Sequence, residues 1–159
     1  IAMGGCTSAH EIGLIKALEE GNYHYIDRAK LEPRAGLMAA YDADIFLSSA
    51  NAITDDGIMV NIDGNSNRVS CIAQGPKKVI FIVGINKVCA DLDSAMKRAR
   101  NVAAPINAQR VKSNTPCSKT GTCMDCKSPD TICCQFLITR YSRHAGRIHV
   151  ILVNDALGF

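Results

Sequence analysis

The sequence lacks the features that mark several large classes of protein. It has no hydrophobic run approaching the roughly 18–20 residues of a transmembrane helix, since the longest one covers residues 79–85. It has no basic stretch interleaved with aromatic side chains, the pattern typical of nucleic-acid binding. It also has no internal repeat. We therefore expect no membrane and no nucleic-acid partner, and 159 residues of ordinary composition predict one domain, 1–159, with a single core.

Alternating strand and helix patterns predict an α/β fold with a mostly parallel sheet and flanking helices. Strands are expected at 2–5, 44–47, 58–62, 78–83, 135–139 and 147–153, and helices at 9–20, 31–41, 69–74 and 91–104. Pro33 is expected in the first turn of the helix at 31–41, and a hairpin is expected around the turn dipeptides Asp56-Gly57 and Asp63-Gly64. Pro105 is expected to interrupt the last helix, and the final two strands are expected to form an antiparallel pair. Because the chain starts inside a strand, we expect an N-terminal segment to be missing from it.

The cysteines are the outlier of the composition. Eight are present, and five fall in a loop expected at 113–134, with the spacing Cys-x5-Cys-x2-Cys-x6-Cys-Cys: Cys117, Cys123, Cys126, Cys133 and Cys134. Soft thiolates that converge from a short loop are what a metal ion or cluster needs. Lys119 and Lys127 would offset part of their negative charge. The pattern predicts a metal site.

Three interpretations of this loop stay open at the sequence level. An iron–sulfur cluster, with [4Fe–4S] favoured, would use four of the five cysteines and leave one spare. A structural zinc ion would use the same Cys-x2-Cys element. Disulfides or metal-free thiols are the third interpretation, and adjacency of Cys133 and Cys134 argues against disulfides because neighbouring side chains on a strand point apart. A metal centre with reduced thiols indicates the cytoplasm.

Two other segments are candidates for binding an anionic ligand. The first is a glycine turn between a strand and a helix, where backbone N–H groups can hold an anion: Gly4, Gly5, Cys6 and Thr7. The second is dense in polar side chains: Asn61, Asp63, Gly64, Asn65, Asn67 and Arg68. Candidates for catalysis are Asp55, Asp56 and Asp63 as acid or base, and Cys6 as a nucleophile at a helix start.

Longer motifs resemble one family. They are NAITDDG at 51–57, NIDGN at 61–65, NRV at 67–69, GPKKV at 75–79, GINK at 84–87, RNVAAP at 100–105 and the cysteine loop. Together they are similar to the LUD domain of lactate-utilisation proteins, over essentially the whole chain. The resemblance implies a Rossmann-like fold of the NagB/RpiA/CoA-transferase type, with a ligand groove at the carboxyl ends of the strands. It implies that the glycine turn and segment 61–68 face that groove.

The resemblance leads to three functional hypotheses. The first is a protein of lactate or organic-acid utilisation that binds a small anionic metabolite, holds an iron–sulfur cluster and supports electron transfer with an iron–sulfur or oxidoreductase partner. The second is a stand-alone transferase-like or isomerase-like enzyme with a structural zinc loop. The third is a non-catalytic ligand-binding subunit. Whether the protein is an enzyme stays open at this level.

Overall fold

A computed structural model describes all residues from Ile1 to Phe159. The chain forms two compact units, each assembled from separate stretches of sequence. The first unit contains Ile1–Ser49, Ser70–Ile85 and Ser142–Gly158, and the second contains Ala50–Val69, Asn86–Tyr141 and Phe159. The expectation of a single domain stays a prediction, and each unit is described separately below.

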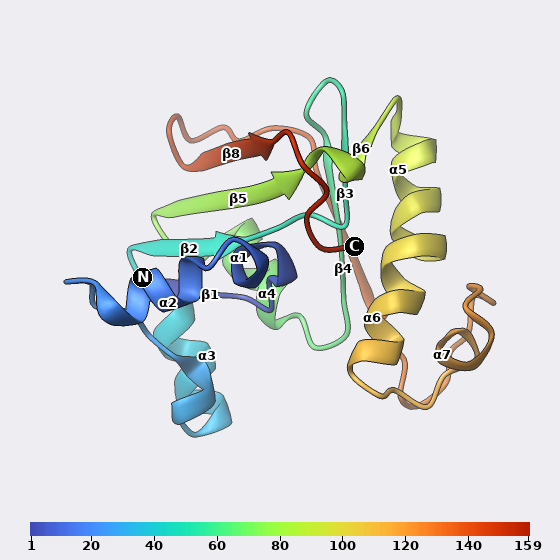
Figure 1. The fold of residues 1–159 in the computed structure, drawn as a ribbon, viewed down its shortest axis with the longest axis horizontal. Helices are drawn as coiled ribbons and strands as arrows, with labels where there is room; N and C mark the ends of the chain where they lie inside the picture. The colour runs from blue at the N-terminus through green and yellow to red at the C-terminus, as the bar shows by residue number, and fades with distance from the viewer. The chain divides into compact units, whose positions relative to one another are not determined.

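The first unit is built on a four-stranded parallel sheet in the order β1-β2-β5-β8 (Figure 1). Its strands are β1 (Ala2–Met3), β2 (Ile45–Ser48), β5 (Lys78–Gly84) and β8 (Ile148–Val153). The apolar, β-branched run of β5 lies between two other strands, where Val79, Phe81 and Val83 are fully buried. Hydrophobic residues therefore place β5 inside the sheet, as its sequence predicts.

The helices of the first unit are short. They are α1 (Thr7–Glu11), α2 (Leu14–Glu20), the 3-10 turn η1 (Arg28–Lys30) and α3 (Pro33–Tyr41); α4 (Asn67–Ala73) and the 3-10 turn η2 (Ile85–Lys87) each begin in one unit and end in the other. The single helix predicted at 9–20 is wrong, because Gly13 adopts a left-handed φ of 71° and divides it. Pro33 lies in the first turn of α3, as predicted, and Glu32 caps that helix by accepting from the N–H of Ala35.

The second unit contains a mixed sheet in the order β6-β3-β4-β7. Its strands are β3 (Ala52–Thr54), β4 (Met59–Asp63), β6 (Val88–Cys89) and β7 (Gln135–Thr139). β3 and β4 form the predicted hairpin, closed by Gly57 at a φ of 92° and by the N–H of Ile58, which donates to Thr54 Oγ1 at 2.8 Å. β7 pairs antiparallel with β4.

A long helical segment packs on this sheet. It comprises α5 (Leu92–Arg98), a π-helical turn η3 (Ala99–Ala103) and α6 (Ala104–Arg110), and a short helix α7 (Pro116–Thr120) follows it. Ala95, Ala99 and Ala104 pack against the sheet core, where their small side chains allow close approach. The predicted break at Pro105 is wrong: the helical segment continues through the proline, which lies in the first turn of α6 directly after the wider π-helical turn.

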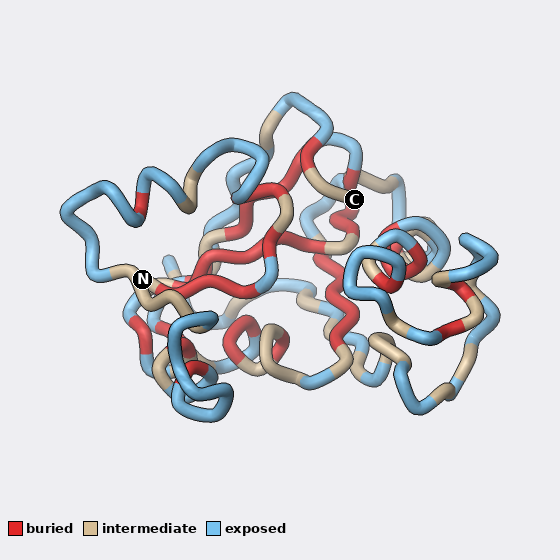
Figure 2. The backbone as a smooth tube through the Cα atoms, turned by 60° about the horizontal axis from the view of Figure 1, so that its bottom comes forward, coloured by how far each residue is buried: buried red, intermediate tan, exposed pale blue.

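The predicted α/β class with a mostly parallel sheet is confirmed. The predicted antiparallel pairing of the last two strands is wrong, because β7 joins β4 whereas β8 joins β5 in the other sheet. Buried residues, red in Figure 2, are concentrated in the strands and in the helix faces turned toward them. None of the helices combines the length and the apolar character needed to span a membrane.

Candidate metal centre

The cysteine loop joins α6 to β7 and is held in place at both of its ends. On one side, α7 begins at Pro116 and ends at Gly121, whose left-handed φ of 73° turns the chain sharply. On the other side, the N–H of Cys134 donates to the carbonyl of Asp63 at 3.0 Å, just before β7 pairs with β4. The two anchors bring both ends of the loop to one region of the second unit.

Four of the five loop cysteines line one small cavity of about 50 Å³: Cys117, Cys123, Cys126 and Cys133. Cys117 is buried on α7, and the other three are partly buried. The remaining lining residues are Arg100, Ala104, Thr115, Met124, Asp125, Thr131, Ile132 and Phe136. The donor set of this cavity, four thiols, fits an iron–sulfur cluster or a zinc ion held by four cysteines.

Cys134 differs from the other four. Its side chain is exposed, it does not line the cavity, and its Sγ lies 3.6 Å from the carbonyl oxygen of Thr131. The loop therefore contains four candidate metal ligands and one thiol, that of Cys134, that lies apart from them. All eight cysteines are free thiols, and no group of three or more His, Cys, Asp or Glu side chains is arranged to hold a metal ion.

The thiols around the cavity influence one another electrostatically. The pKa of Cys133 is raised to about 11, chiefly by burial and to a lesser extent by the neighbouring thiols Cys117, Cys123, Cys126 and Cys134. At Cys126 the pKa is instead lowered, chiefly because the backbone N–H of Ser128 points at its sulfur. Cys133 therefore stays protonated at neutral pH unless a positive charge is bound beside its sulfur.

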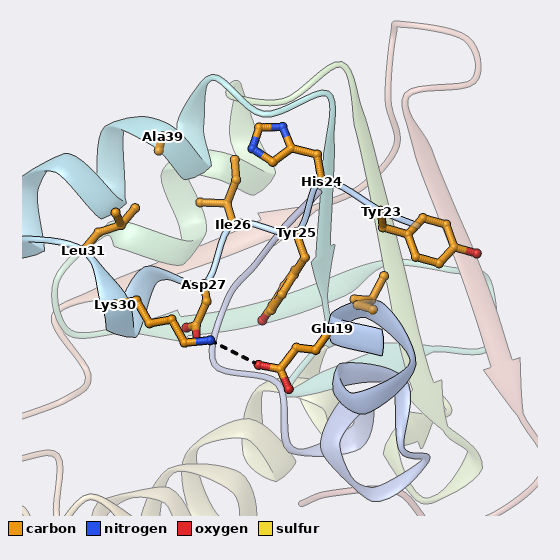
Figure 3. Close-up of a pocket in the computed structure, with 10 residues that line it drawn as sticks. Glu19, Tyr23, His24, Tyr25, Ile26, Asp27, Lys30, Leu31 and Ala39 are labelled. Atoms are coloured by element: carbon orange, nitrogen blue, oxygen red, sulfur yellow. Dashed lines mark ion pairs between the residues drawn. The ribbon is translucent and has the colours of Figure 1, made fainter. Parts of the chain in front are cut away.

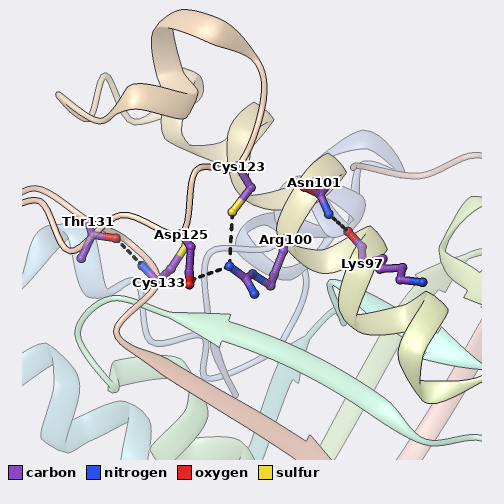
Figure 4. A network of polar contacts seen from close by, with 7 residues as sticks. All are labelled: Lys97, Arg100, Asn101, Cys123, Asp125, Thr131 and Cys133. Carbon is purple, nitrogen blue, oxygen red and sulfur yellow. Dashed lines mark hydrogen bonds and ion pairs between the residues drawn. The ribbon is translucent and has the colours of Figure 1, made fainter.

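One cation already lies beside the cavity. Arg100, on the π-helical turn η3, places Nη2 3.7 Å from Cys123 Sγ and forms an ion pair with Asp125 (Figure 4). These contacts raise the pKa of Arg100, the bond to Cys123 most strongly. The sequence predicts charge compensation by Lys119 and Lys127, which are both exposed, and Arg100 is not among the predicted residues. Its position in RNVAAP, one of the motifs that carry the family resemblance, was the available signal.

The polar segment 61–68 uses its charged groups to hold its own backbone. The carboxylate of Asp63, which is buried, accepts from the N–H groups of Asn65, Arg68 and Val69 at 2.9–3.1 Å, and so caps α4. Arg68 Nη2 donates to Asn51 Oδ1 at 3.0 Å and to the carbonyl of Ile62 at 2.8 Å. Both side chains therefore have structural tasks in this hairpin region.

The remaining residues of that segment lie in mixed surroundings. Asn61 is fully buried, Asn65 is exposed, and Asn67 Oδ1 accepts from the N–H of Arg68. Gly64 abuts the cysteine loop, since a Cβ there would lie 3.1 Å from the Cα of Ile132. The structure thus brings part of the polar segment next to the loop, a proximity that separate sequence motifs did not reveal.

Asp55 and Asp56 lie at the exposed tip of the β3–β4 hairpin. The hydroxyl of Thr54 donates to Asp56 Oδ1, and the N–H of Asp55 donates to the carbonyl of Cys89 at 2.9 Å. Asp56 thus stabilises the turn through Thr54. A catalytic role for Asp55, Asp56 or Asp63 stays a prediction.

We compared the sequence with models of known protein families. The family model described as "LUD domain" matches residues 1–153. The chain belongs to the LUD domain family. This family is associated with lactate utilisation. No curated protein and no solved structure matches the chain.

In this LUD domain the glycine turn lies in the first unit. The N–H of Gly4 donates to the carbonyl of Leu47 at 3.1 Å, and Gly5 is exposed, with nothing within 4 Å of the position of a Cβ. Cys6 is buried in an apolar cluster with Leu18 and Leu47. The turn leads into Thr7 at the start of α1. Whether it faces a shared groove with segment 61–68 stays a prediction, as does a nucleophilic role for Cys6.

The first unit of the LUD domain also contains a larger, open cavity of about 730 Å³ (Figure 3). It is lined by Leu18, Glu19, Tyr23, His24, Tyr25, Ile26, Asp27, Lys30, Leu31 and Ala39. Lys30 Nζ lies 3.6 Å from Glu19 and 3.3 Å from Asp27, and burial is the main reason why the pKa of Tyr25 is raised. None of the residues that the sequence argument selected lines this cavity.

Proposed function

We propose that this LUD domain binds an iron–sulfur cluster of the [4Fe–4S] type through Cys117, Cys123, Cys126 and Cys133. The single observation that carries the proposal is that four of five clustered thiols share one cavity. Four cysteine thiolates are the ligand set of such a cluster. When bound, the cluster supplies one-electron transfer.

The residues around the thiols support this role. A [4Fe–4S] cluster with four thiolates carries net negative charge, and Arg100 offers a guanidinium to Cys123. The partly buried Cys133, whose raised pKa opposes ionisation, would become a thiolate only together with bound metal. Cys134 would stay outside the ligand set as an exposed free thiol.

The surroundings of the cavity also suit electron exchange with another protein. Met124 and Phe136, which line the cavity, are 57% and 42% exposed, so the ligand loop lies near the surface. We infer that the partner is an iron–sulfur protein or another oxidoreductase of organic-acid metabolism, because the family is associated with lactate utilisation. Free thiols and a cluster both persist in a reducing compartment, so we place the protein in the cytoplasm.

A small anionic metabolite completes the proposal. The glycine turn at Gly4, Gly5 and Thr7 is the better-supported place for it, because the space at Gly5 is open whereas Asp63 and Arg68 are engaged with their own backbone. A small carboxylate such as lactate fits this chemistry, since backbone N–H groups at a turn bind anions.

The test is reconstitution without oxygen, using ferrous iron and sulfide, followed by analysis of iron, acid-labile sulfide and zinc per chain. We expect about four irons and about four sulfides, with a brown chromophore. Cys133→Ser should lose most of the iron, whereas the matched control Cys134→Ser should keep it all. A colourless protein with one zinc and no acid-labile sulfide would overturn the proposal, and equal loss in both variants would overturn the ligand assignment.

A further inference from the structure

The outer strand of the parallel sheet, β8, exposes apolar side chains on both of its faces. Val150, Ile151 and Leu152 are three consecutive residues, 42%, 52% and 52% exposed. Their side chains alternate between the two faces of the sheet. On the neighbouring strand β5, by contrast, Phe81 and Val83 are fully buried. β5 is therefore covered on both faces of the sheet, whereas β8 is about half exposed on each face.

The free edge of β8 also carries an uninterrupted row of backbone groups. β8 pairs only with β5 and is the last strand of its sheet (Figure 1). The N–H of Val79 donates to the carbonyl of Arg147 at 2.7 Å, and Val79 is in register with Ile148. Backbone groups of alternate residues in a strand point to opposite sides, so Arg147, His149 and Ile151 face β5. The N–H and C=O groups of Ile148, Val150 and Leu152 therefore point outward.

Proteins usually protect such an edge with proline, lysine, a bulge or a very short strand. β8 has none of these: it is six residues long, Ile148–Val153, and its only polar side chain is His149. At the opposite edge of the same sheet β1 is two residues long and buried. The β1 edge is thus too short and too buried to pair with another strand, whereas the β8 edge is long and exposed enough to do so.

We propose that β8 pairs antiparallel with β8 of a second copy of this chain, joining two four-stranded sheets into one of eight strands. Hydrogen-bonded pairs must form between outward-pointing residues, and one register uses all three of them. In it Val150 lies opposite Val150 of the second copy, and Ile148 lies opposite Leu152. The arrangement has a two-fold axis and closes on itself, as most homodimers do.

Charge favours a second copy in this antiparallel direction. The turn before β8 is basic and exposed, with Arg143 and His144, and the turn after it carries the exposed carboxylate of Asp155. In the antiparallel direction the turn with Asp155 in one copy lies at the same end of the strand pair as the basic turn with Arg143 and His144 in the other. A parallel pairing would instead set like charges side by side. The strand thus complements itself in both apolar character and charge.

Because a single pair of six-residue strands buries less than a standard interface, we expect a weak dimer, with a Kd in the micromolar range. Sedimentation velocity on the full chain, from about 1 μM to about 100 μM, should show a monomer–dimer equilibrium. The inference does not depend on metal binding, and Cys133→Ser should dimerise like the wild type.

Val150→Pro is the decisive variant, because the N–H it removes points outward and serves no bond to β5. Circular dichroism should show that the variant stays folded. It should remain monomeric at about 100 μM, because we expect its Kd for self-association to rise about tenfold or more. Val150→Thr, which keeps the N–H, is the matched control and should dimerise. If Val150→Pro does not fold, Leu152→Lys is the replacement and should also be monomeric.

A charge exchange tests the direction of pairing. Arg143→Glu and Asp155→Arg should each weaken self-association, and an equimolar mixture of the two should restore dimers. A wild type that stays monomeric at about 100 μM would overturn the proposal, as would a dimer that Val150→Pro or its replacement leaves unchanged. Binding of a different protein at β8 by a chain that never self-associates would also overturn it.

Discussion

The polar segment 61–68 and the cysteine loop 113–134 are both candidate sites by their composition, but their side chains have different surroundings in the structure. In the polar segment, Asp63 and Arg68 are bonded to nearby backbone groups. In the cysteine loop, four thiols surround a cavity and only Cys123 has a cationic partner. In the polar segment the side chains stabilise a hairpin and the start of α4, whereas in the cysteine loop the thiols line a common cavity.

The difference shows why density of polar residues is a weak sign of a binding site. Asn, Asp and Arg satisfy backbone groups readily, so a cluster of them often stabilises a turn. Thiols form only weak hydrogen bonds and gain little from such a role. Clustered cysteines that share a cavity are therefore the stronger indication of a bound metal.

The largest effect should come from Asp63→Ala. This change leaves the N–H groups of Asn65 and Val69 without their acceptor, whereas the N–H of Arg68 keeps Asn67 Oδ1. We expect the free energy of unfolding to fall by about 2 kcal/mol. Urea denaturation of the metal-free, reduced protein measures it.

Two variants control this measurement. Asp63→Asn keeps one acceptor oxygen and should lose about half as much, and Asn65→Ala, at an exposed side chain, should change stability by less than about 0.5 kcal/mol. If Asp63→Ala were as stable as the wild type, the carboxylate would be free for a ligand and the contrast between the two regions would fail.

Alkylation of the metal-free protein should separate the loop thiols by reactivity. With a pKa of about 11 against an ordinary 9.0, Cys133 carries about 100-fold less thiolate at pH 8 than an unperturbed thiol, and it should react with iodoacetamide more slowly by a similar factor. Cys126, whose pKa is lowered, should react first. Peptide mass spectrometry at timed intervals gives each rate.

The pH dependence has a definite sign. The Cys133 rate should rise about tenfold per pH unit until pH 11, and a plateau near pH 9 would contradict the raised pKa. Between pH 9 and 11 the unfolded chain releases a proton that folded Cys133 retains. Stability of the metal-free protein should therefore fall as the pH rises through this window.

The smallest effect is expected for Arg100→Gln. Removing a guanidinium that donates to Cys123 Sγ should make the midpoint potential of the loaded cluster more negative, by about 1 kcal/mol or on the order of 40 mV for one electron. Iron content should stay the same. Redox titration followed by electron paramagnetic resonance measures the shift. An unchanged potential would mean that Arg100 only forms the ion pair with Asp125 and does not influence the cluster. Lys119→Gln, at an exposed position, is the control.

Local sequence patterns predicted most of the helices and strands. Pro33 at a helix start, the turn at Gly57 and the apolar run of β5 all have physical causes within a few residues of each other. The failures involve partners that lie far away in the chain. Neighbouring β-rich segments suggested a pair of β7 and β8, but their pairing is decided by β4 and β5, more than 60 residues earlier.

At the candidate site, the five cysteines could be selected from spacing, but not the difference between Cys133 and Cys134. That difference depends on which thiol faces α7 and which faces solvent at the entry to β7. Arg100 stands in the motif RNVAAP, but the motif does not reveal its contact with Cys123, because that contact depends on η3 meeting a loop 23 residues later. The hydrogen bonds of Asp63 and Arg68 to nearby backbone groups depend on the folded hairpin and could not be predicted from the sequence, and a ligand-binding role for these two residues stays a prediction.

The π-helical turn Ala99–Ala103 keeps the two α-helical pieces beside it on the same face of the sheet. One extra residue in a regular α-helix would rotate everything after it by about 100°, whereas the wider π turn absorbs that residue within a single turn. Ala95 before the turn, Ala99 within it and Ala104 after it therefore all pack on one sheet core. Arg100 belongs to the wide turn itself, so its contact with the cysteine loop requires no change in how α5 and α6 lie on the sheet.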